Sequence, residues 1–132
     1  MDLWPVAAVI LGFQLVAFSW RIAREIEMWK EGEPIWFPLA DWLMLVSWAT
    51  LVIGVFIIPV VIEFERWAKL AFGTSLVFMV GYPFALLGHY SLFRKTGRPR
   101  IVPYAPIEER AIVVAFLAAG VIYCILSAVL SS

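Results

Sequence analysis

The chain has 132 residues, of which 64% are hydrophobic and 15% are charged. A soluble domain contains about 45–50% apolar and about 25% charged residues, so the composition excludes an ordinary soluble domain. Basic and acidic residues cancel to a net charge of zero, and we therefore expect no nucleic-acid partner. The single cysteine, Cys124, excludes an intrachain disulfide and a metal site built from cysteines.

Four apolar runs are each long enough to cross a membrane as an α-helix, and they cover residues 3–22, 39–62, 70–93 and 111–130. At about 1.5 Å per residue, roughly 20 residues cross a hydrocarbon layer of about 30 Å. The runs do not alternate between apolar and polar residues, so helices are expected rather than barrel strands. We therefore predict an all-α membrane protein in which residues 1–132 form one compact bundle of four transmembrane helices.

The first run, residues 3–22, has some features of a secretory signal peptide. Such a peptide begins with positive charge, whereas this run is preceded by Asp2 and followed by Arg21 and Arg24. We expect an uncleaved signal anchor. Helical spacing of apolar residues continues beyond the run, and the first helix is predicted to extend to Lys30.

Basic residues are concentrated in two of the three connections between the runs. Eight of them lie at or in the first and third connections, against two in the second. Because cytoplasmic loops of membrane proteins carry an excess of Lys and Arg, loops 23–38 and 94–110 are predicted to be cytoplasmic. Both termini are then outside, in a multi-pass protein of the plasma membrane.

The third run, residues 70–93, differs from the others because it carries a stripe of polar side chains and a proline. Ser75, Tyr82 and His89 are spaced seven residues apart, so they lie on one side of a helix. Pro83 has no N–H to donate within the helix, and we predict a kink there. The stripe is either a groove that binds a ligand, with His89 as acid/base or haem ligand, or a set of groups that bond to neighbouring helices. The second interpretation is favoured because the chain has no second histidine.

The connection after the third run is the most basic segment of the chain. Its first four basic residues are Arg94, Lys95, Arg98 and Arg100. We expect them to attract anionic lipid headgroups or a partner protein at the cytoplasmic surface. An enzyme acting on a phosphorylated lipid needs carboxylates, and we interpret Glu108 and Glu109 as helix-capping residues instead. No catalytic residue, metal or cofactor is expected.

Each run also carries a stripe of small residues, which allows helix backbones to approach closely in a membrane. The stripes are Ala8/Gly12, Ser47/Thr50/Gly54, Gly81/Ala85/Gly88 and Ala111/Ala115/Ala119. One stripe on each helix is sufficient for a single bundle, although such stripes also dock other proteins.

The central part of each run contains no Asp, Glu, Lys or Arg, which disfavours a secondary transporter. We predict a small membrane protein without catalysis of its own, which acts as an accessory, assembly or scaffold subunit. Its partners are expected to be the lipid bilayer and other membrane subunits or copies of itself. The alternatives are a homo-oligomeric channel for a small solute, lined by Ser75, Tyr82 and His89, and a lipid-modifying or haem-binding protein.

Overall fold

The computed structural model describes residues 3–32, 37–61, 65–90 and 104–130. Its helices are α1 (Leu3–Lys30), α2 (Leu39–Leu51), the π-helical turn η1 (Val52–Ile57), α3 (Ile58–Val61), α4 (Glu65–His89) and α5 (Ile107–Leu130). Because α2, η1 and α3 form one continuous helix, four helices are long and apolar enough to cross a membrane. The predicted fold, an all-α bundle of four membrane-spanning helices, is confirmed.

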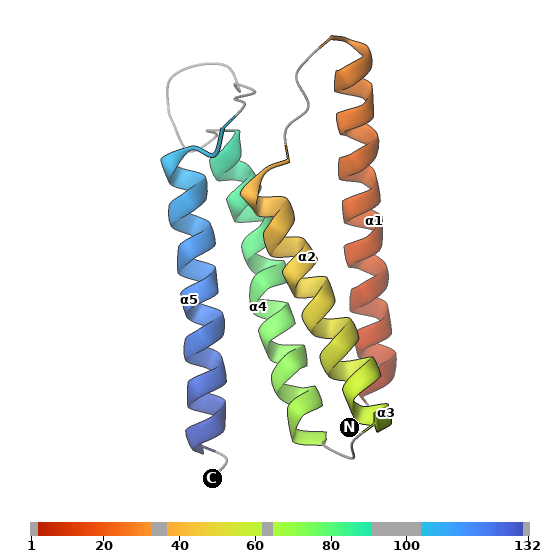
Figure 1. Cartoon of the computed structure of the whole chain (residues 1–132), viewed down its shortest axis with the longest axis vertical. Helices are drawn as coiled ribbons and strands as arrows, with labels where there is room; N and C mark the ends of the chain where they lie inside the picture. The colour runs from red at the N-terminus through yellow and green to blue at the C-terminus, as the bar shows by residue number, and fades with distance from the viewer. Residues whose placement is uncertain (1–2, 33–36, 62–64, 91–103, 131–132) are drawn as a thin grey trace.

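The central helices of the bundle are α2 and α4, and the other two helices lie on opposite sides of this pair (Figure 1). Both central helices contact α1 and α5, whereas no contact joins α1 to α5 among the described residues. The ends of α1 and α4 lie at the same end of the bundle as the starts of α2 and α5 (Figure 1). We call this the basic end, because the two connections rich in Lys and Arg join the helices there. The opposite end, with both termini, is called the terminal end.

Glycines allow α4 and α5 to pack closely against each other. Gly73, Gly81 and Gly88 of α4 face Tyr123, Phe116 and Glu109 of α5. A Cβ atom on Gly81 would lie 2.5 Å from Cγ of Phe116, so only glycine leaves room for the aromatic ring. The partners on α5 recur every seven residues, which is the spacing of two antiparallel helices that cross at a small angle.

Helix α1 contacts the bundle along a narrow line. Its buried residues are Ala7, Gln14 and Arg21, which are again seven residues apart. The helix continues to Lys30, as predicted, and ends where Gly32 adopts a left-handed φ of 83°. Its last turns extend beyond the rest of the basic end (Figure 1).

Two of the four small-residue stripes pack inside the bundle and two do not. Gly81/Ala85/Gly88 is buried, and so are Ser47 and Gly54 of the second stripe, whose Thr50 is half-buried. In contrast, Ala8/Gly12 of α1 and Ala111/Ala115/Ala119 of α5 are exposed on the surface of the bundle. The inner face of α1 is formed instead by Ala7, Gln14 and Arg21, and that of α5 by Glu109, Phe116 and Gly120.

The centre of the bundle also contains a π-helical turn that the sequence did not indicate. In η1, the successive residues Gly54 and Val55 are both buried. A Cβ atom on Gly54 would lie 2.1 Å from Cβ of Ala71, so the turn brings α4 very close to the second span. The kink predicted at Pro83 is not confirmed, since α4 is one uninterrupted helix through this exposed residue.

We expect Gly88→Ala to destabilise the protein by about 1–3 kcal/mol, because the added methyl group meets backbone rather than a movable side chain. A Cβ atom on Gly88 would lie 2.9 Å from the backbone N of Glu109. Gly12→Ala is the matched control, since nothing lies within 4 Å of a Cβ atom there. Thermal unfolding in detergent measures both, and equal stability of the two variants would contradict the close packing.

Candidate functional site

Some of the charged side chains near the basic end are buried between helices instead of lying on the surface. Arg21 of α1 is only 5% exposed and Asp41 of α2 only 2%. Arg21 forms an ion pair with Glu25 on its own helix, and its Nε lies 3.7 Å from Oδ2 of Asp41. Charged side chains in membrane-embedded helices face the bundle interior and pair with one another, because lipid does not solvate them.

Tyr82 extends this ion pair to α4. Its hydroxyl donates a long hydrogen bond of 3.5 Å to Oδ1 of Asp41. The carboxylate of Asp41 therefore lies near a cation of α1 and accepts a hydrogen bond from α4. Asp41 is also in the first turn of α2, where the helix dipole favours a negative charge.

Glu109 of α5 connects the remaining elements at this end. It is fully buried, and its Oε1 accepts a hydrogen bond of 3.0 Å from the backbone N–H of Ala40. Its Oε2 lies 2.8 Å from Nδ1 of His89, the last residue of α4. The residue before α2 is Pro38, which provides no side-chain cap, so the carboxylate of Glu109 satisfies an N–H group that the local sequence leaves unpaired. Glu109 lies in the first turn of α5, as predicted, but its carboxylate bonds to α2 and α4 rather than to N–H groups of its own helix.

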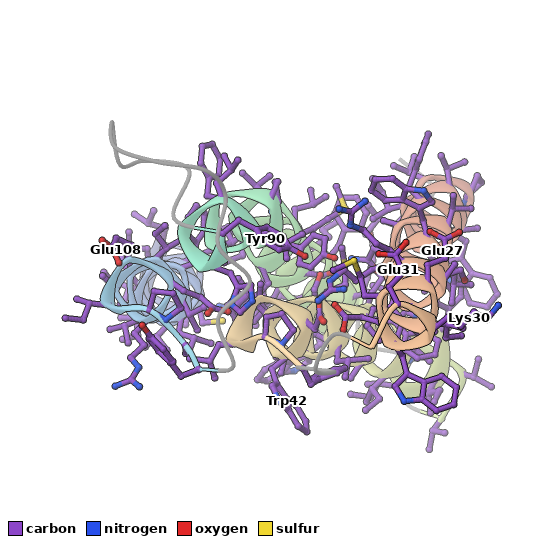
Figure 2. The ribbon with its side chains drawn as sticks, turned by 90° about the horizontal axis from the view of Figure 1, so that it is seen from above. Glu27, Lys30, Glu31, Trp42, Tyr90 and Glu108 are labelled. Carbon is purple, nitrogen blue, oxygen red and sulfur yellow. The ribbon has the colours of Figure 1, made fainter. Side chains whose placement is uncertain are left out.

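The surface around this charged cluster is seen in Figure 2, which looks onto the basic end. Glu27, Lys30 and Glu31 of α1 lie at one side of the view and Glu108 of α5 at the other. All four helices contribute to this charged cluster, which consists of the half-buried Glu25 and the buried residues Arg21, Asp41, Tyr82, His89 and Glu109.

A second polar cluster lies near the middle of the bundle. Nε2 of Gln14 donates to Oγ of Ser47 at 2.7 Å, and Oγ of Ser47 donates to the carbonyl of Ser75 at 2.7 Å. The two serine hydroxyls are 3.0 Å apart, so Ser75 donates to Ser47 in turn. Gln14 is 11 residues into α1, about 17 Å along its axis and therefore near mid-membrane.

The three candidate ligand-binding residues lie on one stripe, as the sequence indicated, and they bond to two neighbouring helices, the first two to α2 and the third to α5. Ser75 bonds to Ser47, Tyr82 to Asp41 and His89 to Glu109. All three are buried. This arrangement matches the favoured interpretation, in which the stripe bonds to neighbouring helices. The proposed headgroup-binding residues Arg94, Lys95, Arg98 and Arg100 lie outside the described residues.

The bonding partners Gln14, Asp41 and Glu109 were not identified from the sequence as site residues. A usable signal exists for Gln14, because it lies seven residues from Arg21 and thus on the same side of α1. No local pattern distinguishes Glu109 from Glu108, since both follow Pro106 in the first turn of α5.

The chemistry of both clusters is that of hydrogen bonds and ion pairs within the protein. Among the described residues, no group of three or more His, Cys, Asp or Glu is arranged to hold a metal ion. Comparison of the chain with family models, curated proteins and solved structures found no match. Any function assigned to the protein therefore depends on its own geometry.

We expect Glu109→Ala to cost about 3 kcal/mol of stability, because it leaves His89 and the N–H of Ala40 buried without their partner. Glu109→Gln keeps an acceptor for Ala40 and should cost less. Glu27→Ala, which removes an exposed carboxylate from α1, is the control. Unfolding in detergent should show the largest loss of stability for Glu109→Ala, a smaller loss for Glu109→Gln and the smallest for the control. A Glu109→Ala protein as stable as the control would show that this carboxylate does not join the helices.

Ser47→Ala should destabilise the protein by about 1 kcal/mol, because it removes the hydroxyl that Gln14 and Ser75 share. Thr50→Val is the matched control on the same helix, since among the described residues Oγ1 of Thr50 bonds only to the carbonyl of Val46 one turn away. The test is the difference in unfolding free energy between the two variants. Equal unfolding free energies would show that the central cluster does not contribute to stability.

Proposed function

We propose that the protein is an accessory or assembly subunit of a membrane complex, without catalysis of its own, that binds transmembrane helices of another protein. The observation that carries this proposal is the outward orientation of two small-residue stripes. Ala8/Gly12 on α1 and Ala111/Ala115/Ala119 on α5 are exposed, on the two helices that lie at opposite sides of the bundle.

Small residues promote helix association in lipid because they let two backbones approach closely. Gly12 is open on the described part of the molecule, with nothing within 4 Å of a Cβ atom. On α5, the three alanines lie on a different side from the Phe116 and Gly120 face that packs against α4. Two such faces suit a subunit that lies between, or beside, helices of a larger assembly.

The inner polar groups support the same proposal. Ser75, Tyr82 and His89 are bonded to Ser47, Asp41 and Glu109, and a channel lined by these three residues would require those bonds to open. Nδ1 of His89 is engaged by Glu109 and the residue is 2% exposed, which also disfavours it as a haem ligand or as the acid/base of a lipid-modifying site. The accessory function needs none of these groups to be free.

The proposed location is the plasma membrane, with both termini outside and loops 23–38 and 94–110 in the cytoplasm. The basic end then faces the cytoplasm, where anionic lipid headgroups attract its Lys and Arg residues. The helix ends that the first and third connections join lie at the same end of the bundle, as this topology requires (Figure 1).

The test is native mass spectrometry of the protein extracted gently from its own membrane. We expect a mass that contains different chains, and we expect Gly12→Leu or Ala115→Leu to reduce that complex at least about tenfold while the thermal stability of the isolated protein changes little. The matched controls are Val6→Leu and Val121→Leu, which enlarge exposed residues on other sides of the same helices and should leave the complex intact.

The opposite outcome is a homo-oligomer, or a protein that purifies alone from its native membrane. Either result would exclude the accessory function. Solute flux through liposomes that contain only this protein would then test the channel, with Tyr82→Phe and His89→Ala as the informative variants.

A further inference from the structure

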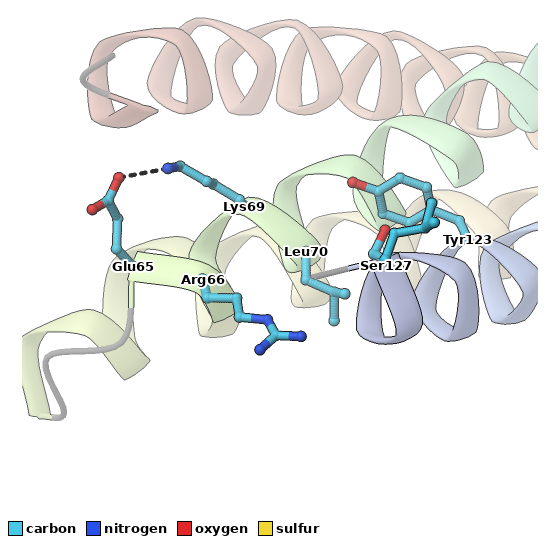
Figure 3. A pocket seen from close by; sticks show the side chains of 7 residues that line it. Glu65, Arg66, Lys69, Leu70, Tyr123 and Ser127 are labelled. Carbon is cyan, nitrogen blue, oxygen red and sulfur yellow. Dashed lines mark ion pairs between the residues drawn. The ribbon is translucent and has the colours of Figure 1, made fainter. Parts of the chain in front are cut away.

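The α4–α5 pair is hollowed at the terminal end, far from the polar clusters. One hollow has a volume of about 700 Å³ and is lined by Glu65, Arg66, Lys69, Leu70, Tyr123, Ser127 and Leu130 (Figure 3). A second, of about 500 Å³, is lined by Arg66, Trp67, Leu70, Cys124, Ile125 and Ala128. Because they share Arg66 and Leu70, we treat them together as the α4–α5 groove. Both volumes are in the range of small-molecule sites, which is about 300–1,000 Å³.

The two parts of the groove differ in chemistry. The larger part contains two cations, Arg66 and Lys69, and one carboxylate, Glu65, so that it carries one net positive charge. The side chains of Tyr123 and Ser127 add hydroxyl groups. The smaller part is lined, apart from Arg66, by apolar side chains and the thiol of Cys124. A cationic compartment beside an apolar one matches a molecule with an anionic head and a hydrocarbon tail.

Arg66 is the cation best placed to bind an anion. Lys69 is already paired with the carboxylate of Glu65 at 2.7 Å, as Figure 3 shows. Nη2 of Arg66 donates to the carbonyl of Ala128 at 3.0 Å, which anchors the side chain across the groove to α5 without neutralising its charge. A guanidinium has five N–H donors in a planar fork, and this geometry suits a phosphate group.

The position of the groove along the helices also fits a lipid. Arg66 is the second residue of α4, so it lies at the level where a membrane-spanning helix meets the headgroups. Leu70 and Cys124 lie about one to two turns deeper, in the range of the acyl chains. Trp67 is exposed beside them, as tryptophans are at membrane interfaces.

We propose that the α4–α5 groove binds one anionic phospholipid, with its phosphate on Arg66 and one acyl chain along Leu70, Cys124 and Ile125. The hydroxyls of Tyr123 and Ser127 and the ammonium of Lys69 face the polar part of the head. This site lies on described residues at the terminal end and is separate from the basic connection at the other end.

The experiment is native mass spectrometry of the delipidated protein titrated with phosphatidylglycerol. We expect one lipid to bind tightly, and Arg66→Gln to weaken that binding about fivefold to tenfold because it removes one cation at the headgroup. Arg24→Gln, the same change at an exposed arginine of α1, should leave binding unchanged. Phosphatidylcholine should bind more weakly, and inorganic phosphate should not displace the lipid because it lacks the chain.

A second pair of variants tests the apolar part without changing charge. Ala128→Trp fills the groove and should abolish tight binding, whereas Ala118→Trp places the same ring on another exposed part of α5 and should not. The proposal is overturned if Arg66→Gln binds as well as the wild type, if Ala128→Trp and Ala118→Trp behave alike, or if phosphate alone competes. The titration uses the isolated protein, so its result does not depend on whether the protein forms the proposed complex with other membrane subunits.

Discussion

The carboxylate of Glu109 is the contact on which the basic end of the bundle depends. It joins the start of α5 to the first turn of α2 through the N–H of Ala40 and to the last residue of α4 through His89. These residues are 69 and 20 positions from Glu109 in the chain. In lipid, an unpaired N–H or carboxylate has no water to bond with, so one buried side chain fixes the relative positions of three helices.

Buried residues spaced seven apart on α1 and α4 fix the relative positions of the helices along the rest of the bundle. Ala7, Gln14 and Arg21 on α1 meet the core in successive layers, and Ser75, Tyr82 and His89 do the same on α4. Two layers are polar, one formed by Gln14 with both serines and one by the charged cluster at the basic end. Sliding one helix by a turn would place a polar group against hydrocarbon, so the polar layers specify the register of a bundle whose apolar contacts alone would tolerate several alternatives.

The sequence was sufficient to predict four spans, the end of α1 and the stripe of Ser75, Tyr82 and His89, because each follows from local periodicity and composition. The partners of that stripe were not predicted. Their bonds cross between helices at separations of 20 to 41 residues, and no local pattern says which faces meet. On α1 and α5, the stripes of small residues did not identify the inner face of the helix. A small residue shows where another helix can approach closely, but it does not show which helix does so. Gln14 and Arg21 were the better guide, because a polar side chain in lipid must find a partner and therefore marks the inner face.

The polar groups inside the bundle are mostly paired with one another, although Oε1 of Gln14 accepts no hydrogen bond from the described residues, whereas the outer faces of α1, α4 and α5 are open. Inside, the hydroxyl of Ser47 donates once and accepts twice, and Glu109 uses both oxygens. Outside, the exposed stripe lies on α1, whereas the groove opens between α4 and α5. Among the described residues α1 contacts α4 but not α5, and α1 and α5 lie on opposite sides of the bundle (Figure 1). The proposed partner helix on α1 and the proposed lipid at Arg66 would therefore occupy different sides of the bundle, so a change at one would leave the other intact. On α5 the situation differs, because the alanine stripe and Ala128 belong to the same helix. A lipid held at Arg66 would then border any partner bound to α5 and contribute to that interface.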